Sequence, residues 1–306
     1  MAESLSLQKI AYAAECIAYD LLSQKAGDRV RPMIEYHQLI GVSSGTVKNA
    51  FDYLEKTGAA SFSRHGHEGS YIKALDYRKL QGCCTKKEIL GIMPLPYSRR
   101  YEGLASAFYD QLSDLSFNMA YARGAQSRVR LVDSRTCHFA ITSRYAALEL
   151  IQEGMNVKVS LDLGPESYLS SHVLVMRRGN DRIRKGMRVA YDENSLDQKS
   201  ITLAVTASVP VEFVSLRTQQ TVSALLEGRI DAGVWNYDAV MDHPALQELS
   251  VIQLPRQQYT DSFTSAVVVI HKDNWTLDRL LTSRITKDET MRIIDECIME
   301  RRVPVY

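Results

Sequence analysis

The first 75 residues place apolar side chains at helical spacing and then switch to short alternating runs. In "PMIEYHQLI" (residues 32–40) apolar positions recur every three or four residues, as on one helical face. Gly41 ends that helix, and a second apolar stripe follows in residues 47–54. A further helix is predicted in residues 5–22, and the Gly-rich stretch "RHGHEG" between alternating runs predicts a β-hairpin. The pattern therefore predicts a winged helix-turn-helix in residues 1–75.

The turn between these two helices, "GVSSG" at residues 41–45, also fits the G-x-S-x-G pattern of a hydrolase nucleophile elbow. An elbow needs a buried strand before its serine and several earlier strands to build the sheet. Only 42 residues precede Ser43, and those beside it have helical spacing. Ser43 is instead placed to cap the second helix. The sequence favours a helix-turn-helix over a hydrolase.

Short apolar runs alternate with helical stretches in the rest of the chain. The runs "EILGIM", "CHFAIT" and "NVKVSLDL" belong to a first series, and "SHVLVMRR", "VEFVSL" and "RIDAGVWN" belong to a second. This alternation predicts an α/β architecture with mainly parallel sheets flanked by helices. We predict a linker in residues 76–87, one lobe from residues 88–165 and 266–306, and a second lobe from residues 166–265.

The charge of the chain is nearly balanced. The 306 residues carry a formal net charge of +1. Residues 1–87 hold 12 Lys and Arg against 9 Asp and Glu, a net charge of +3, and the remainder holds 25 against 27, a net charge of −2. This mild asymmetry is compatible with nucleic-acid binding at the N-terminal end. No apolar run approaches membrane-spanning length and the start lacks a signal-peptide pattern, so we expect a cytoplasmic protein.

The winged-helix region carries four motifs in a fixed order. They are "GDRV" at residues 27–30, the "GVS" turn, "TVKNA" at residues 46–50, and the wing. In this order and spacing they resemble the N-terminal domain of the GntR family of bacterial transcription regulators, which implies DNA binding. The chain departs from that family at Ser44, where relatives typically carry arginine. It also carries Pro32-Met33-Ile34 where relatives typically carry a Ser-Glu-Arg run. Because the family arginines at these places are expected phosphate or base contacts, the resemblance does not fix the operator affinity or sequence preference of this chain.

The outward face of the second helix of this motif carries side chains suited to DNA. Lys48 can reach guanine acceptors or phosphate, and Asn49 can address adenine. Ser43 and Thr46 are short hydroxyls suited to phosphate oxygens at a helix N-terminus. The wing tip suits the minor groove or the backbone, and its two histidines lack partners for a metal site. The candidate contacts to double-stranded DNA are Arg31, Ser43, Ser44, Thr46, Lys48, Asn49, Arg64, His65 and His67.

The later segment also resembles a known fold. It contains "ILGIMPLPYSRRYEGLA", "FAITSRYA" and "LLEGRIDAGVWN" in this order. Together these elements are similar to the type 2 periplasmic-binding-protein fold, which also forms the effector domain of LysR-type regulators. A GntR-like start joined to such a domain resembles the bacterial YhfZ-type regulators. The resemblance implies a small-molecule effector bound between two lobes.

Ligands of open α/β sheets bind beyond the carboxyl ends of the strands, where helix N-termini point their free N–H groups. Three arginines and several hydroxyls follow the predicted strands, which suggests a carboxylate or phosphate effector. Trp235 ends an apolar strand, and we favour a place in the core with its indole edge reaching the cleft. The candidate ligand-binding residues are Tyr97, Ser98, Arg99, Tyr121, Arg123, Gly124, Thr142, Ser143, Arg144, Asn194, Ser195, Ser215, Thr218, Trp235 and Asn236.

The sequence lacks the common catalytic motifs. No metalloprotease, Walker, dinucleotide-binding or paired-cysteine zinc pattern occurs, so we predict no catalytic residues, metal or cofactor. The leading hypothesis is a ligand-responsive transcriptional regulator that binds a palindromic operator as a homodimer. The alternative is a two-lobed small-molecule-binding protein or enzyme whose winged helix serves assembly only.

Overall fold

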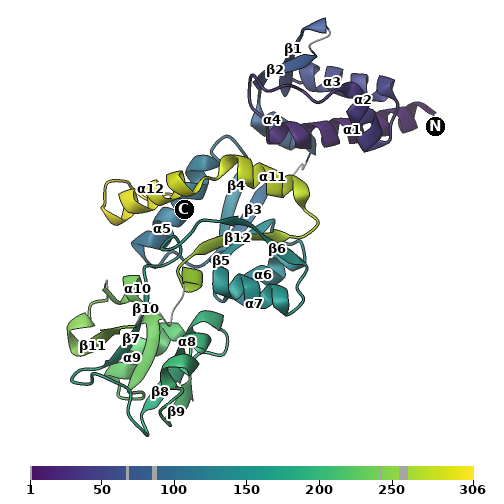
Figure 1. Cartoon of the computed structure of the whole chain (residues 1–306). Helices are drawn as coiled ribbons and strands as arrows, with labels where there is room; N and C mark the ends of the chain where they lie inside the picture. The colour runs from purple at the N-terminus through teal and green to yellow at the C-terminus, as the bar shows by residue number, and fades with distance from the viewer. Residues whose placement is uncertain (1, 67–68, 85–87, 242, 255–260) are drawn as a thin grey trace. The chain divides into compact units, whose positions relative to one another are not determined.

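The computed structural model describes residues 2–66, 69–84, 88–241, 243–254 and 261–306 (Figure 1). The chain divides into two compact units. The first holds Met1–Ile89, Gln111–Asn118 and Trp275–Arg284, and the second holds Leu90–Asp110, Met119–Asn274 and Ile285–Tyr306. Within the described ranges, no helix is both long and apolar enough to cross a bilayer.

The first unit contains the winged helix. Gly41 ends α2 with a φ of 73°, a conformation that favours glycine. Ser43 caps α3, because its Oγ accepts a hydrogen bond from the Thr46 N–H at 3.2 Å. The predicted helix-turn-helix is confirmed. Its elements are α1 (Ala2–Leu22), α2 (Met33–Ile40), α3 (Ser44–Lys56) and the antiparallel strands β1 (Ala60–Arg64) and β2 (Ser70–Leu75).

Aromatic rings fill the core of the winged helix. Phe51 lies edge-to-face against Tyr36, with 5.5 Å between ring centroids, and against Phe62, with 5.2 Å between ring centroids. The other apolar residues of the predicted α3 stripe, including Val47 and Leu54, are also fully buried. Burial of this stripe fixes the phase of α3 and leaves its opposite side in solvent.

The segment expected to be a linker contains helix α4 (Tyr77–Cys84). This helix packs against α1 and buries Leu80 and Gln81. The Gln81 amide nitrogen donates to the Ser116 carbonyl at 2.7 Å, and the Ser116 N–H donates back to Gln81 Oε1 at 2.6 Å. Because Tyr77, Leu80 and Cys84 share one helical face, a short amphipathic helix forms where the longer apolar periodicity breaks.

Helix α11 (Trp275–Arg284) also belongs to the first unit, although it comes late in the chain. Arg279 Nη1 donates to Asp20 Oδ1 on α1 at 2.9 Å. Arg284 Nη1 lies 2.6 Å from Asp114 Oδ2, and its guanidinium lies 3.8 Å from the ring centroid of Tyr77. The C-terminal part of the sequence therefore returns to the N-terminal unit.

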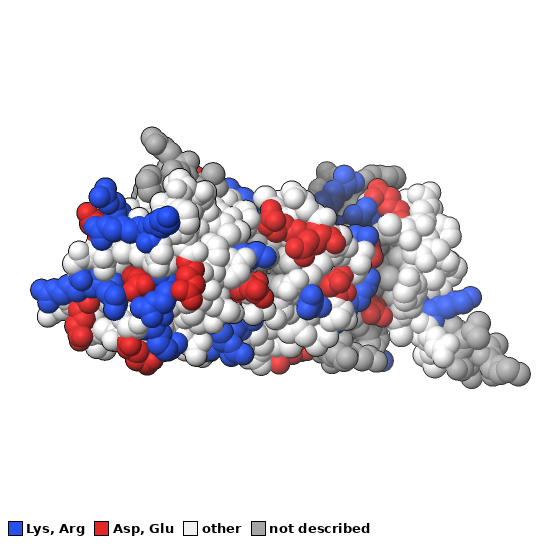
Figure 2. Space-filling model, turned by 90° about the horizontal axis from the view of Figure 1, so that it is seen from below, with Lys and Arg blue, Asp and Glu red and all other residues white. Residues whose placement is uncertain are grey.

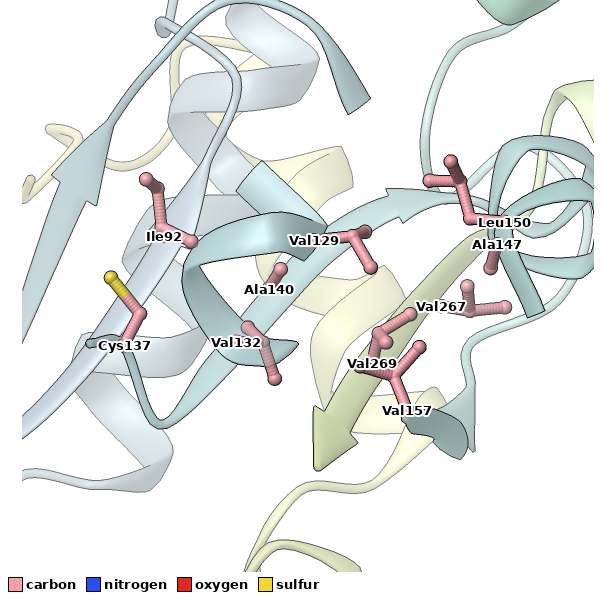
Figure 3. Packing of buried hydrophobic residues seen from close by; sticks show 10 residues of the cluster. All are labelled: Ile92, Val129, Val132, Cys137, Ala140, Ala147, Leu150, Val157, Val267 and Val269. Carbon is pink, nitrogen blue, oxygen red and sulfur yellow. The ribbon is translucent and has the colours of Figure 1, made fainter. Parts of the chain in front are cut away.

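Lobe one is a five-stranded sheet in the order β4-β3-β5-β12-β6. Helices α6 and α7 lie on one face and α5 and α12 on the other (Figure 1). Figure 3 shows ten buried side chains of this core, from Ile92 to Val269. The strands are β3 (Ile89–Met93), β4 (Phe117–Tyr121), β5 (Phe139–Ser143), β6 (Val157–Asp162) and β12 (Ala266–His271), and the helices are α5 (Arg99–Gln111), α6 (Ala125–Asp133), α7 (Arg144–Gln152) and α12 (Lys287–Ile298).

Lobe two is a second five-stranded sheet, in the order β11-β7-β10-β8-β9. Its core includes Val173, Val175 and Trp235. Three-residue 3₁₀ turns lie at Thr218–Gln220, Leu246–Glu248 and Asp261–Phe263. The strands are β7 (His172–Arg177), β8 (Arg188–Tyr191), β9 (Glu212–Ser215), β10 (Ala232–Asn236) and β11 (Leu249–Gln253), and the helices are α8 (Leu196–Thr206), α9 (Thr221–Leu226) and α10 (Tyr237–Met241).

The two-lobed α/β architecture is confirmed, but both sheets are mixed rather than mainly parallel. Strand β12 runs antiparallel to β5 and β6, and β7 runs antiparallel to β10 and β11. The pairs of β3 with β5, β8 with β9 and β8 with β10 are parallel. The antiparallel strands β7 and β12 each follow directly after a crossing between the lobes. Among the residues that the structure describes, no crossover helix precedes them to make them parallel to their neighbours.

Candidate DNA-binding surface and ligand-binding cleft

The N-terminal half of α3 presents polar side chains to solvent. Ser43 and Ser44 are exposed at the start of the helix, and Lys48 and Asn49 are exposed one turn later. Thr46 is half-buried, and its hydroxyl lies 2.8 Å from the Ser43 Oγ. These side chains lie at the N-terminus of α3. A helix N-terminus favours anions, and recognition helices contact base edges with their N-terminal residues.

Two of the candidate DNA-contacting arginines are engaged by acids of their own unit. Arg64 Nη2 lies 2.8 Å from Glu55 Oε2 on α3. Arg31 Nη2 lies 3.6 Å from Asp20 Oδ1, and its Nη1 lies 3.5 Å from Glu35 Oε2. Their guanidinium groups therefore reach phosphate only by exchanging an existing ion pair.

The wing tip is described in part. His65 is exposed and lies edge-to-face against Tyr71, with 5.7 Å between ring centroids. His67, the last of the candidate DNA contacts, lies outside the described residues.

A buried arginine lies between the two lobes. Arg128 on α6 is 3% exposed. Its Nε donates to the Ile141 carbonyl at 3.2 Å, its Nη1 to the Ala122 carbonyl at 2.9 Å, and its Nη2 to the Tyr168 hydroxyl at 3.1 Å. All three acceptors are neutral, and in the described part of the chain no carboxylate lies within ion-pair distance of this guanidinium. Buried cations normally have an anionic partner, and Arg128 has none at ion-pair distance among the described residues.

A carboxyl group of lobe two meets a hydroxyl of lobe one at the same interface. Asp197, in the first turn of α8, is 8% exposed, and its Oδ1 accepts a hydrogen bond from Ser143 Oγ at 2.8 Å. Ser143 also caps α7, since its Oγ accepts from the Ala146 N–H at 3.1 Å. Burial raises the pKa of Asp197 to about 7, although the Ser143 hydrogen bond and the charge of Arg128 both act to lower it. Asp197 therefore titrates near neutral pH.

Three tyrosine rings continue this interface. Tyr97 lies edge-to-face against Tyr101, and Tyr101 lies edge-to-face against Tyr168, each with 5.2 Å between ring centroids. Tyr101 and Tyr168 are buried, and burial raises the pKa of both hydroxyls. The Tyr168 hydroxyl that accepts from Arg128 is therefore neutral.

Neighbouring strands of lobe two supply further buried polar atoms. His172 on β7 pairs in register with Asn236 on β10. Both ring nitrogens of His172, Nδ2 of Asn236 and the Oγ of Ser170 are buried without a hydrogen-bond partner among the described residues. Burial lowers the pKa of His172 to about 4, so the imidazole is neutral at neutral pH. A buried polar group without a partner costs about 1–3 kcal/mol, so these atoms mark a place where a ligand or water is favoured.

Several sequence-predicted ligand residues lie at this interface. Thr142, Ser143 and Asn236 are fully buried, and Ser98 is buried with its Oγ 3.4 Å from the Tyr101 N–H. Gly124 caps α6 close to the partner lobe, since a Cβ built there would lie 3.7 Å from the carbonyl oxygen of Asn194.

None of the three arginines predicted for the cleft is buried. Arg99 pairs with Glu102 at 3.1 Å and with Glu300 at 3.2 Å, and Arg144 pairs with Asp162 at 2.5 Å. Arg123 is exposed. The guanidinium groups of Arg99 and Arg144 therefore pair with acids of lobe one, and the buried cation is Arg128, five residues beyond Arg123.

The remaining candidates are spread over both lobes. Thr218 donates to Asp192 through both its N–H, at 2.8 Å, and its hydroxyl, at 2.9 Å. Ser195 precedes α8 without capping it, and Ser215 is exposed at the end of β9. Tyr121 lies edge-to-face against Tyr306. Trp235 packs in the lobe-two core beside His243.

The fold defines a class of protein: a helix-turn-helix domain joined to a two-lobed domain of the kind seen in periplasmic substrate-binding proteins. Residues 25–72 match the family described as a helix-turn-helix domain. Residues 76–306 match the family described as the YhfZ C-terminal domain. The chain belongs to the YhfZ family.

Known relatives agree with this assignment. The protein YhfZ of Escherichia coli (strain K12) is 31% identical over 296 residues, which cover 95% of each chain. The crystal structure of YhfZ from Shigella flexneri has a TM-score of 0.61 and 30% identity, covering 72% of this chain and 93% of that one. AbpA of Streptococcus pneumoniae, an amino acid ABC transporter substrate-binding protein bound to L-arginine, has a TM-score of 0.50 and 14% identity, covering 71% of this chain and 94% of that one. This last likeness shows the fold alone.

Proposed function

We propose that this protein is a ligand-responsive transcriptional regulator. Its winged helix, used as in GntR-type regulators, binds operator DNA, and the interface between its lobes binds a small anionic metabolite. The observation that carries the proposal is Arg128, a buried inter-lobe guanidinium with three neutral acceptors and no carboxylate partner among the described residues. An effector carboxylate or phosphate supplies the anionic partner that Arg128 lacks at ion-pair distance among those residues.

The DNA-binding half rests on the exposed face of α3. Lys48 and Asn49 are assigned to base edges or phosphate, and Ser43, Ser44 and Thr46 to phosphate oxygens at the helix N-terminus. Arg64 and His65 contribute from the wing once Arg64 exchanges Glu55 for phosphate. Each such exchange leaves a carboxylate beside the DNA, so we expect modest affinity at physiological salt.

The ligand-binding half rests on the donors that converge between the lobes. Three of the five N–H donors of Arg128 are used, which leaves two for an anion. Ser143 lies at the N-terminus of α7, where the helix dipole favours negative charge. His172 and Asn236 add neutral polar atoms that have no partner among the described residues. We therefore place the anion beside Arg128 rather than beside Arg99 or Arg144.

A thermal-shift screen tests the ligand site. The probes are glutamate, citrate, pyruvate and inorganic phosphate, applied to the wild type, to Arg128→Gln and to the control Arg144→Gln. We expect the stabilising anion to lose its shift in Arg128→Gln and to keep it in Arg144→Gln, each measured from the variant's own baseline. An anion that stabilises all three proteins equally contradicts the proposed site.

Fluorescence anisotropy with a labelled duplex tests the DNA-binding half. We expect affinity to fall steeply as salt rises, and Lys48→Ala to weaken binding and to reduce the slope of log K against log salt by about 0.9. The control Lys272→Ala removes an exposed lysine far along the sequence and should leave the slope unchanged. Absence of DNA binding at low salt refutes this half.

The assembly and the location follow from the same proposal. A homodimer matches the two half-sites of a palindromic operator, because a two-fold axis relates both. A protein that binds operator DNA acts in the bacterial cytoplasm, so we propose that location. The inter-lobe interface is assigned to binding and not to catalysis.

A further inference from the structure

The connection between β7 and β8 on lobe two is strongly basic. Residues 177–188 read "RRGNDRIRKGMR" and contain six Lys and Arg against one Asp, in a chain whose net charge is +1. All six cationic side chains are exposed except that of Arg188, which is half-buried. We call this segment the basic loop. It belongs to neither of the two proposed binding sites.

Ion pairs within lobe two neutralise only part of the positive charge of the basic loop. Asp231 at the start of β10 binds both Arg177, at 2.8 Å, and Arg188, at 3.1 Å. Asp181 within the loop binds Arg184 at 2.7 Å. Asp231 thus joins the two ends of the loop, and the Asp181–Arg184 pair lies within it.

Three cations of the loop take no part in these ion pairs. Arg178, Arg182 and Lys185 are exposed, and the ion pairs among the described residues include none of them. Glu212 on β9 is the further acid whose charge acts on Arg188. The six cations of the loop and the three acids Asp181, Asp231 and Glu212 sum to a net charge of +3. Figure 2 shows several blue side chains at the left of the view, over lobe two, with red side chains among them.

We propose that the basic loop is a second DNA-contacting surface, which binds the phosphate backbone of duplex DNA without reading its sequence. The loop has the chemistry of a phosphate contact, because it offers exposed guanidinium and ammonium groups. Its apolar residues, Ile183 and Met187, are half-buried, so it lacks the exposed aromatic or aliphatic anchors that protein interfaces use. The inference rests on the proposed function, since the winged helix is what brings duplex DNA to the protein.

The salt dependence of DNA binding tests this inference. The variant Arg178→Gln/Arg182→Gln/Lys185→Gln is compared with Arg130→Gln/Lys272→Gln/Arg301→Gln, which removes three exposed cations of the second unit and changes the net charge equally. Both are full-length chains, titrated with a 60-base-pair duplex of random sequence at a series of salt concentrations. Lys48→Ala is titrated beside them as a probe of the winged helix.

The basic-loop variant is expected to lower the slope of log K against log salt by about 0.9 for each phosphate that the loop no longer neutralises, thus by about 2 to 3, while the control variant keeps the wild-type slope. Equal slopes for the two triple variants overturn the proposal. If Lys48→Ala weakens binding while the basic-loop variant does not, the loop inference alone fails. If the wild type binds no duplex, the proposed function fails with it.

Discussion

Asp197 and His172 lie at the lobe interface with pKa values displaced in opposite directions. Burial disfavours the charged form of each, which raises the pKa of the acid to about 7 and lowers that of the imidazole to about 4. At neutral pH the imidazole is neutral and the carboxyl is divided between its two forms. The charge of the interface therefore changes near the pH of the cell, and it does so through Asp197.

The pKa of Asp197 predicts how stability depends on pH. Because its pKa in the folded protein lies above the ordinary value of 3.8, the contribution of this group is complete below that value and is lost as pH rises through about 7. A shift of this size amounts to about 4 kcal/mol at most. We expect the wild type to lose more stability between pH 5 and pH 8 than Asp197→Asn, measured by chemical denaturation. His172 contributes a pH dependence of opposite sign, but it is present in both proteins and cancels in the comparison. Parallel stability–pH profiles of the wild type and Asp197→Asn would contradict the raised pKa of Asp197.

The Ser43 cap gives a second prediction at this scale. Ser43→Ala removes the acceptor of the Thr46 N–H and should destabilise the protein by about 1 kcal/mol. Ser44→Ala, one residue later on the exposed side of α3, should change stability by less than about 0.5 kcal/mol. Urea denaturation of the two variants measures this difference. Equal losses in the free energy of unfolding would argue against a capping role for Ser43.

The sequence predicts some of the polar residues at the lobe interface and omits others. Ser143 and Asn236 end predicted strands, and both are buried in the structure. Arg128 was missed because it lies inside α6, where its burial depends on which helical face meets the sheet, and strand ends do not reveal that phase. Asp197 was missed because its neighbour in space, Ser143, is 54 residues away in the sequence.

Helix α1 carries a buried carboxylate that several elements share. Asp20 accepts a hydrogen bond from the Tyr36 hydroxyl of α2 at 2.6 Å and from Gln24 Nε2 at 3.0 Å. The guanidinium groups of Arg279 on α11 and Arg31 before α2 lie 2.9 Å and 3.6 Å away. One side chain thus connects the helix-turn-helix to a helix from the end of the sequence.

Removal of this carboxylate should loosen the helix-turn-helix. Asp20→Ala leaves the buried Tyr36 hydroxyl and Arg279 without this acceptor and leaves Arg31 with Glu35 alone among the described acids, and we expect a loss of about 2–3 kcal/mol. Asp273→Ala removes an exposed acid that pairs with Arg135, and it should cost less than about 0.5 kcal/mol. Amide hydrogen exchange in α2 is the measurement; protection equal to that of the wild type in Asp20→Ala contradicts the shared role.

Elements with a long one-sided apolar stripe were predictable, and short ones were not. The stripe of α3 fixed both its phase and its boundaries, since each apolar position is buried as expected. The sequence predicts a linker where α4 lies, because eight residues that include Gly82 and two cysteines give a weak helical pattern. Its stability comes from tertiary contacts, above all those of Gln81 with Ser116, which no local pattern records.

The two functions proposed for this molecule must be linked if the effector controls DNA binding. Linkage requires that an anion which changes DNA affinity by a given factor has its own affinity changed by the same factor when DNA is bound. Couplings of this kind amount to about 1–3 kcal/mol, which is about 5- to 150-fold. We expect equal factors when an anion found by thermal shift is titrated with and without a duplex. No coupling in either direction would mean that the cleft does not regulate DNA binding.

At the scale of the whole molecule, the order of elements predicted two α/β lobes correctly, while strand direction was predictable only in part. Repeated strand–helix units predict parallel neighbours. The strands that begin directly after a crossing between lobes, β7 and β12, carry no such signal. Their antiparallel pairing depends on the end of the sheet at which the chain enters each lobe after the crossing.

The contacts of α1 with α4 and α11 limit how this chain can be divided. A fragment that stops at Leu75 keeps every motif of a winged helix, yet it exposes the side of α1 that Leu80 and Gln81 cover and removes Arg279 from Asp20. We therefore expect gene fusions or truncations that contain the N-terminal segment alone to yield a destabilised helix-turn-helix domain.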